Sequence, residues 1–425
     1  MLDPEYTIER IPQELDKEGW NLEYDKTYLR VYSLENASDS GLVGFKTVTE
    51  HLANPSDIVA FLKEVCSAME QMNDLYAEGG VLREWPSPMD PQGQLVRTAF
   101  KMPFPMKNRS FVHGIHSVQT SENCWIVGYT PTEARDVPVL SGYHRCGMYV
   151  SGQRITKLPS GLVRVEHLMV YALGGSIPTG IQDRFFKSSH VGAYIKEWRG
   201  MGRQFFPPQR HQLDPDTLKV CLLAALQKSS TWPSKGKGTQ GFVSVGELSY
   251  CPHQVYRLDI DLEGCLETIT HILADASLEF LPQWNREFMN GQIVEVIEET
   301  STRSAWVLEV NYKTPSPLNH RSYYYYFSRE WISKDEVLIS YQSIKNPKGP
   351  SSGFEQALLY PSLHFCKRLE GNRTRVVHLL ATSLGGKLAR YQDGLLQSSL
   401  IKAQYRDMEN QVALLTKKPH LAVSR

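Results

Sequence analysis

Two arginines and two histidines recur at matching places in the two halves of this 425-residue chain: Arg109 with Arg321, and His167 with His378. On strands that border an apolar space, an arginine can bind an anionic group of a ligand and a histidine can form a hydrogen bond with it, because buried polar groups need partners. Alternatives stay open for both. The arginines can be surface or salt-bridged residues, and the histidines can be structural residues with hydrogen bonds of their own.

Four consecutive tyrosines begin at Tyr323. On a strand, Tyr323 and Tyr325 share one face and the other two tyrosines share the opposite face. Together with Trp306 and Trp331 they can form an aromatic cage for a quaternary ammonium group. The competing interpretation is that they are strand-forming core residues that pair across a sheet.

The sequence contains no HExxH, GxSxG, P-loop or GxGxxG pattern, so we predict no catalytic residue, no cofactor and no metal site. His113 and His116 stand three residues apart on a predicted strand and therefore point to opposite faces, which is poor geometry for metal ligands. Asp259 and Asp261 share a face, but the first half has no matching acidic pair. We interpret these two aspartates as charges of a sheet edge or a loop.

Composition and charge exclude several classes of protein. The chain has 46 basic and 46 acidic residues, so it lacks the basic surface of a general nucleic-acid binder. Its longest apolar run, Val220 to Leu226, is far shorter than the roughly 18 residues that span a bilayer. The first ten residues lack the pattern of a secretory signal, and the seven scattered cysteines are typical of reduced thiols. These features predict a cytoplasmic protein.

The two halves are copies of one another. Residues 103–111 align with 315–323, with both prolines, the Arg-Ser pair and the final aromatic residue retained. Residues 164–175 align with 375–386, where seven of twelve positions are identical. The matches keep the same order over a length that far exceeds the roughly 20–50 residues of a solenoid unit, so they indicate duplication of a whole domain.

Each half has the same succession of predicted elements, and we place the two domains at 4–206 and 215–416. Helical periodicity, alternating strands and a Gly-Gly turn predict an α+β domain, in which one long C-terminal helix covers an antiparallel sheet. The predicted elements include helices over 4–20, 215–227 and 178–201, a helix that begins after Asn54, and strands over 28–32, 44–48 and 162–173.

The apolar stripe of the last predicted helix has large residues at both ends and small ones between them, at Ile181, Phe185, Ser188, Gly192, Ile195 and Trp198. A well-packed helix is filled throughout, so a ligand can lie beneath the small residues. The alternative is that a side chain of the sheet fills the gap. The second half repeats the stripe loosely, with Lys402 in place of the glycine, at Leu388, Tyr391, Leu395, Ser398, Tyr405, Met408 and Val412.

The ordered set of segments resembles the START domain, the lipid-transfer module named after the steroidogenic acute regulatory protein. The resemblance rests on Trp20, Leu29–Tyr32, Phe45-Lys46, Phe104–Val112 and Gly174–Pro178. It covers the whole chain as two tandem copies and is closer in the first. The departures from the family pattern are Ser110, Ala172-Leu173 and, in the second copy, Lys387-Leu388-Ala389.

The resemblance implies a helix-grip fold, in which a curved sheet wraps around the C-terminal helix and encloses a tunnel for a sterol, phospholipid or sphingolipid. It also implies non-enzymatic lipid transfer with transient contact at a membrane surface, through gate loops that map to 136–142 and 346–353. The predicted lipid-binding residues are Arg109, Arg145, Tyr149, His167, Ile181, Phe185, Ser188, Gly192, Ile195, Trp198, Arg321, Tyr323, Tyr325, His378, Leu395 and Tyr405.

Two other interpretations remain open. The helix-grip superfamily includes polyketide cyclases and aromatases, which use the same cavity for chemistry, and a shifted pKa of a cavity histidine or carboxylate would favour this interpretation. Alternatively, the diverged second copy is a ligand-gated module that binds a protein partner. A filled second cavity and a large exposed apolar patch would favour that interpretation.

Overall fold

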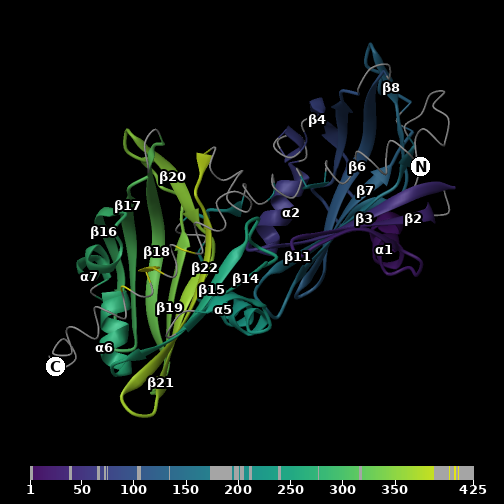
Figure 1. Ribbon diagram of the computed structural model, residues 1–425. Coiled ribbons are helices and arrows are strands. Elements are labelled where there is room, and N and C mark those ends of the chain that lie inside the picture. The colour runs from purple at the N-terminus through teal and green to yellow at the C-terminus, as the bar shows by residue number, and fades with distance from the viewer. Residues whose placement is uncertain are drawn as a thin grey trace. The chain divides into compact units, whose positions relative to one another are not determined.

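The structure is a computed structural model in which each half of the chain contains one large antiparallel sheet with few helices (Figure 1). The chain divides into two compact units, residues 1–205 and 206–425. The described residues are 3–37, 41–64, 68–70, 73, 75–102, 107–133, 135–172, 194–195, 201, 205–209, 213–237, 241–275, 277–314, 318–386, 402, 406–407 and 410.

The elements of the first unit are α1 (Pro4–Leu15), β1 (Asn21–Lys26), β2 (Leu29–Ala37), β3 (Leu42–His51), α2 (Pro55–Lys63), β4 (Tyr76–Glu84), β5 (Gln94–Phe100), β6 (Asn108–Ser121), β7 (Cys124–Pro131), β8 (Tyr143–Arg145), β9 (Gly147–Met148), β10 (Ser151–Lys157), β11 (Val163–Met169) and β12 (Tyr171–Ala172). Helix α1 starts because the side chain of Asp3 accepts a hydrogen bond from the backbone N–H of Glu5 and Pro4 occupies the first turn. The helix ends at Leu15, a few residues before Gly19, which has a φ of +89°. It is shorter than the helix predicted over 4–20.

The elements of the second unit are α5 (Pro215–Ser229), β13 (Ser234–Lys237), β14 (Gly241–Gly246), β15 (Val255–Glu263), α6 (Leu266–Thr270), the π-helical turn η2 (His271–Asp275), α7 (Ser277–Trp284), β16 (Phe288–Glu299), β17 (Arg303–Tyr312), β18 (His320–Ser333), β19 (Glu336–Ser343), β20 (Phe354–Leu359), β21 (Ser362–Leu369) and β22 (Arg373–Ser383). Asp214 and Pro215 start α5 in the way that Asp3 and Pro4 start α1.

The two sheets have the same strand order, which confirms two sheet-rich repeats in tandem. The first runs β1-β2-β3-β11-β10-β7-β6-β5-β4, with β8 beside β6. The second runs β13-β14-β15-β22-β21-β19-β18-β17-β16, with β20 beside β18. Equivalent residues are 211 or 212 positions apart, so each strand of the first sheet has its counterpart in the second.

Helices cover both faces of the first sheet. Ile11 of α1 packs on the face that we term the outer face, and a Cβ on Gly152 of β10 would lie 2.5 Å from Ile11 Cδ1, so glycine permits this approach. Helix α2 packs on the opposite, inner face, where Ile58 and Leu62 join a core cluster with Val127. The inner face carries the candidate site.

Asp90 fixes the position of α2. Its carboxylate is buried, lies 2.9 Å from Lys63 Nζ at the end of α2, and accepts a hydrogen bond of 2.7 Å from the backbone N–H of Ser117 on β6. Burial opposes ionisation, but the bonds from Lys63 and Ser117 outweigh it and hold the pKa of Asp90 below its ordinary value. The ion pair therefore joins α2 to the sheet through β6.

The strand predicted over 162–173 is interrupted at Val170, between β11 and β12. There the hydroxyl of Ser151 accepts a hydrogen bond from the N–H of Val170 and donates one to its carbonyl oxygen. Ser362 makes the same two bonds with Ala381 in the second unit. In both units, one serine hydroxyl therefore bonds to both the N–H and the carbonyl oxygen of a single residue.

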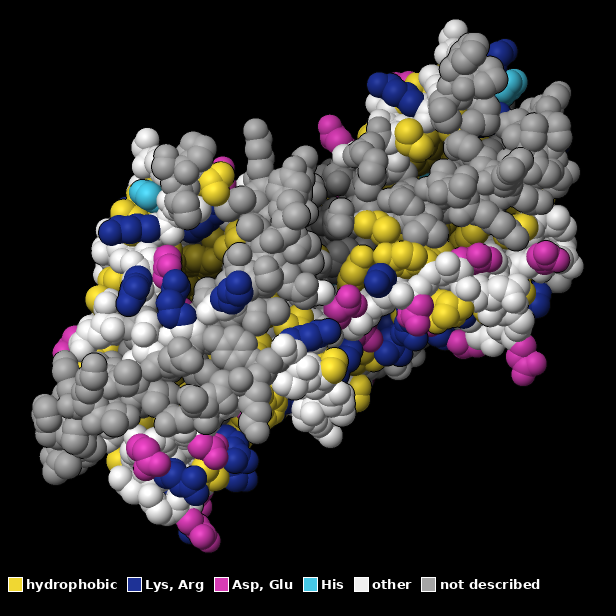
Figure 2. Space-filling view, viewed as in Figure 1, with side chains coloured by type: hydrophobic (Ala, Val, Ile, Leu, Met, Phe, Trp, Pro, Cys, Tyr) yellow, Lys and Arg dark blue, Asp and Glu magenta, His cyan; other side chains and the backbone are white. Residues whose placement is uncertain are grey.

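Asp259 and Asp261 do not lie at an edge or in a loop, which corrects the prediction from sequence. They lie on β15, between β14 and β22, where Asp259 pairs with Arg257 and Asp261 with Arg375, each at 2.7 Å. Among the described residues that Figure 2 shows, basic and acidic side chains are interspersed. No helix in the described part of the chain is both long enough and apolar enough to cross a membrane.

Candidate functional site

A row of polar side chains crosses the inner face of the first sheet. Thr47 on β3, His167 on β11 and Gln153 on β10 are direct partners across neighbouring strands. All three are buried, and Gln153 is only 1% exposed. The register of the three strands therefore brings together residues that are as far apart in sequence as Thr47 and His167.

Gln153 also connects this row to the neighbouring aromatic residues. Its Nε2 donates a hydrogen bond of 2.7 Å to the hydroxyl of Tyr129 on β7. The ring of Tyr129 makes edge-on contacts with His113 at 5.4 Å and with His167 at 6.2 Å, measured between ring centroids. The Oε1 atom of Gln153 is buried and has no hydrogen-bond partner among the described residues.

A small pocket, partly open to solvent, lies against this row. Its apolar lining residues are Leu29, Leu62, Val165 and Met201, and its polar ones are Thr47, Thr49, Gln153, His167 and Tyr194. None of these described lining residues carries a formal charge when histidine is neutral. A mostly apolar cavity with a few converging polar groups is typical of a binding site for a small hydrophobic molecule.

The corresponding row of the second unit differs in composition. Leu258 on β15, His378 on β22 and His364 on β21 are the cross-strand partners. The imidazole rings of His364 and His378 stack at 4.1 Å, and His378 Nε2 lies 2.5 Å from the hydroxyl of Tyr341. Burial lowers the pKa of His378 to about 4, so this imidazole is neutral near pH 7.

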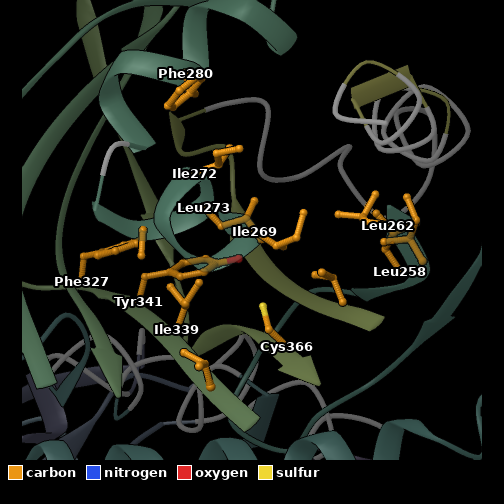
Figure 3. Packing of buried hydrophobic residues seen from close by; sticks show 14 of the residues in the cluster. Leu258, Leu262, Ile269, Ile272, Leu273, Phe280, Phe327, Ile339, Tyr341 and Cys366 are labelled. Carbon is orange, nitrogen blue, oxygen red and sulfur yellow. The ribbon is translucent and has the colours of Figure 1, made fainter. Parts of the chain in front are cut away.

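On the second sheet, the face that corresponds to the inner face of the first sheet is aliphatic along strand β15. Leu258, Ile260 and Leu262 stand where the first unit has Thr47, Thr49 and His51, and all three belong to one buried hydrophobic cluster. Figure 3 shows part of this cluster, with Tyr341 beside Phe327 and Ile339. The two inner faces therefore share a fold but present different chemistry along this strand.

Arg109 and Arg321 have the same conformation in the two units. Nη1 of each arginine lies 2.5 Å from the carbonyl oxygen two residues earlier and 3.4 Å from that of the preceding residue. Arg321 also pairs with Glu355 at 3.1 Å. Both side chains are buried, and these contacts give each arginine a structural role. Ligand binding by either arginine remains a prediction.

Arg145 and Tyr149 lie near the first predicted gate loop. Arg145 Nη2 donates a hydrogen bond of 2.7 Å to the carbonyl oxygen of Val137, which ties strand β8 to that loop. Tyr149 is 37% exposed. Neither residue is among the described residues that line the cavity, whereas His167 is.

The remaining predicted residues fall into two groups. Ile195 packs against the cluster around Phe45 and Phe111. Tyr323 is buried and Tyr325 is partly buried against the core: the hydroxyl of Tyr323 lies 3.3 Å from Thr382 Oγ1, and the ring of Tyr325 contacts those of Phe327 and Tyr341. Outside the described residues lie Ile181, Phe185, Ser188, Gly192, Trp198, Leu395 and Tyr405.

Sequence reasoning missed Thr47, Gln153 and Tyr129. A signal for one of them was present, because Tyr129 recurs as Tyr341 at the offset of 212 that relates the two halves. Gln153 recurs as His364, a change of residue type that hides the correspondence. Thr47 recurs as Leu258, so only the strand register identifies it as part of the site.

Two buried histidines of the first inner face make the first unit sensitive to acid. Burial lowers the pKa of His51 and of His113 to about 4, whereas the unfolded chain protonates each near 6.5. Between these pH values the unfolded state binds more protons, so stability is expected to fall as the pH decreases from 6.5 towards 4. Each histidine contributes at most about 1.4 kcal/mol per pH unit.

This prediction is checked by the melting temperature as a function of pH. The variant H51L/H113Y carries the residues that the second unit has at these positions, Leu262 and Tyr325. It should lose less stability than the wild type over this pH range. Parallel curves for the two proteins would contradict the prediction.

Comparison with known protein families decides the identity of the fold. The START domain model matches residues 14–205 and again residues 215–413. The chain belongs to the START domain family. This START protein therefore has the predicted helix-grip α+β fold in two tandem copies, in agreement with the shared strand order of its two sheets.

Solved structures similar to this START protein include human StAR-related lipid transfer protein 5, with 17% identity and a TM-score of 0.42 over 48% of this chain and 94% of that chain. Human STARD10 has 15% identity and a TM-score of 0.39 over 54% of this chain and 84% of that chain. The Zhui aromatase/cyclase from Streptomyces sp. R1128 has 9% identity and a TM-score of 0.27 over 39% of this chain and 94% of that chain. No curated protein matches the sequence.

Proposed function

We propose that this START protein binds a lipid in the cavity of its first repeat and carries it between membranes without changing it chemically. The observation that carries the proposal is the cavity itself, which is lined by the apolar residues Leu29, Leu62 and Val165 and by the polar residues Thr47 and Gln153. Each methylene group that leaves water for such a cavity gains about 0.8 kcal/mol. A membrane offers the lipid tail a similar environment, so uptake and release can both occur.

Two histidines with shifted pKa values, His113 and His378, are not among the described residues that line the cavity. Burial is the cause of the lowered pKa of His113 and of His378. A catalytic acid or base works best with a pKa near the operating pH, which a value of about 4 does not provide in the cytoplasm. These imidazoles are suited to neutral hydrogen bonds with other groups.

We place this activity in the cytoplasm, with transient contacts at membrane surfaces through the gate loops. In the first repeat Val139 is an exposed apolar residue of the loop 136–142, and Arg145 holds this loop from β8. An exposed apolar side chain at a loop tip can enter the interfacial region of a bilayer. A protein partner that binds the second repeat is the alternative function.

Native mass spectrometry of the full chain, followed by extraction and identification of any bound lipid, tests the proposal. One unmodified lipid per chain, and transfer of that lipid from donor to acceptor vesicles, are the expected results. A chain that copurifies with no lipid and transfers none between vesicles would contradict lipid transport. Chemical conversion of the lipid would contradict the non-enzymatic mechanism.

A further inference from the structure

The amide of Gln153 is the most informative group in the cavity. It is 1% exposed, and it uses one polar atom for Tyr129 and leaves the other without a partner among the described residues. A buried polar atom without a partner costs about 1–3 kcal/mol, so its retention points to a ligand that completes it. Thr47, which borders the same cavity, is separated from Gln153 in the sheet only by His167.

We propose that the first repeat selects a lipid whose polar end is an uncharged hydroxyl group, and that Gln153 and Thr47 bind this hydroxyl. The inference rests on the proposed lipid binding and deepens it. A hydroxyl can both donate and accept a hydrogen bond. It therefore satisfies Gln153 whichever of the two amide atoms faces the cavity.

The absence of charge among the described lining residues favours a neutral polar end. A phosphate or an ammonium group that enters this cavity would lose its hydration, and no described lining residue provides an opposite charge. Desolvation of an ion without such a partner costs several kcal/mol or more, whereas a hydroxyl needs only one or two hydrogen bonds. When His167 is neutral, the described part of the lining therefore favours a hydroxyl over a phosphate or an ammonium group.

The second repeat lacks this pair of residues. Leu258 occupies the position of Thr47, and His364 occupies that of Gln153. The adjacent inner positions of β15, Ile260 and Leu262, are aliphatic as well. Selection of a hydroxyl group by this pair is therefore a property of the first repeat.

The test compares the full-length wild type with the variants T47V and T47V/Q153L. Phosphatidylcholine vesicles that contain radiolabelled cholesterol, ceramide or phosphatidylserine are the probes, and the lipid extracted by the protein is measured after separation from the vesicles. The matched control is Q119L/T120V, which makes equivalent changes at exposed positions at the end of β6. Circular dichroism and thermal melting verify the fold of each variant.

The wild type and the control should extract cholesterol or ceramide at least about tenfold better than phosphatidylserine. The double variant should lose about tenfold of this extraction, as expected for two lost hydrogen bonds. The nearly isosteric variant T47V should lose about threefold of this extraction. If the double variant fails to fold, the extraction by T47V alone tests the proposal.

The remaining outcomes separate the two proposals. If the wild type extracts none of the three lipids and no phosphatidylcholine, the proposed function fails. If it extracts phospholipids as well as the hydroxyl lipids, or if folded variants extract cholesterol and ceramide as the wild type does, only the selection of a hydroxyl group is wrong.

Discussion

A chain in which phenylalanine replaces Val165 is expected to lose at least about tenfold of its lipid uptake. Val165 lies on β11 between Thr49 and Ile155, it is 3% exposed, and it lines the cavity of the first repeat. The larger ring would occupy the space that a lipid tail needs. Because Val165 also belongs to a packed core cluster, overpacking should in addition cost about 1–3 kcal/mol of stability.

Lipid transfer between vesicles, measured beside the melting temperature, checks this prediction. The matched control is V81F on strand β4, where the side chain of Val81 is 55% exposed. The control should transfer lipid as the wild type does. Unchanged transfer by a folded V165F protein would show that lipid does not bind in this cavity.

The change G385A is expected to destabilise the second unit by about 2–4 kcal/mol. Gly385 has a φ of +70°, a conformation that costs alanine about 1 kcal/mol relative to glycine. A Cβ at this position would also lie 2.0 Å from the carbonyl oxygen of Gln356 on β20, so the backbone must shift, with a further cost of about 1–3 kcal/mol.

Gly371 provides the comparison for this substitution. It has a φ of +73°, but a Cβ there would meet no atom within 4 Å. G371A should therefore cost only the conformational part, about 1 kcal/mol. Urea unfolding of the two variants measures the difference, and equal losses would show that the contact with Gln356 is unimportant.

The sequence predicted the duplication, the α+β class and several strands of the sheet, because these depend on local periodicity and on the similarity of the halves. It also placed Glu166 and His167 on opposite faces, as the structure confirms: Glu166 pairs with Arg154 at 2.7 Å, whereas His167 lines the cavity. Alternation along one strand is enough for such a prediction.

The composition of the candidate site was beyond the reach of local patterns. Thr47 meets His167 only through the pairing of β3 with β11, and Gln153 meets Tyr129 through the pairing of β10 with β7. These registers depend on which strands become neighbours in the finished sheet. The interior position of Asp259 on β15 was missed for the same reason.

The paired bonds of Ser151 and Ser362 have an evolutionary consequence. Each hydroxyl bonds to the backbone N–H and carbonyl oxygen of one residue, which is Val170 between β11 and β12 in the first repeat and Ala381 on β22 in the second. The position is therefore bonded from a neighbouring strand, β10 in the first repeat and β21 in the second. Beyond this position the sequences of the two copies differ: Ser176-Ile177-Pro178 of the first copy corresponds to Lys387-Leu388-Ala389 of the second. Duplication has thus kept this bonding pattern in both sheets, while the sequence that follows it has changed.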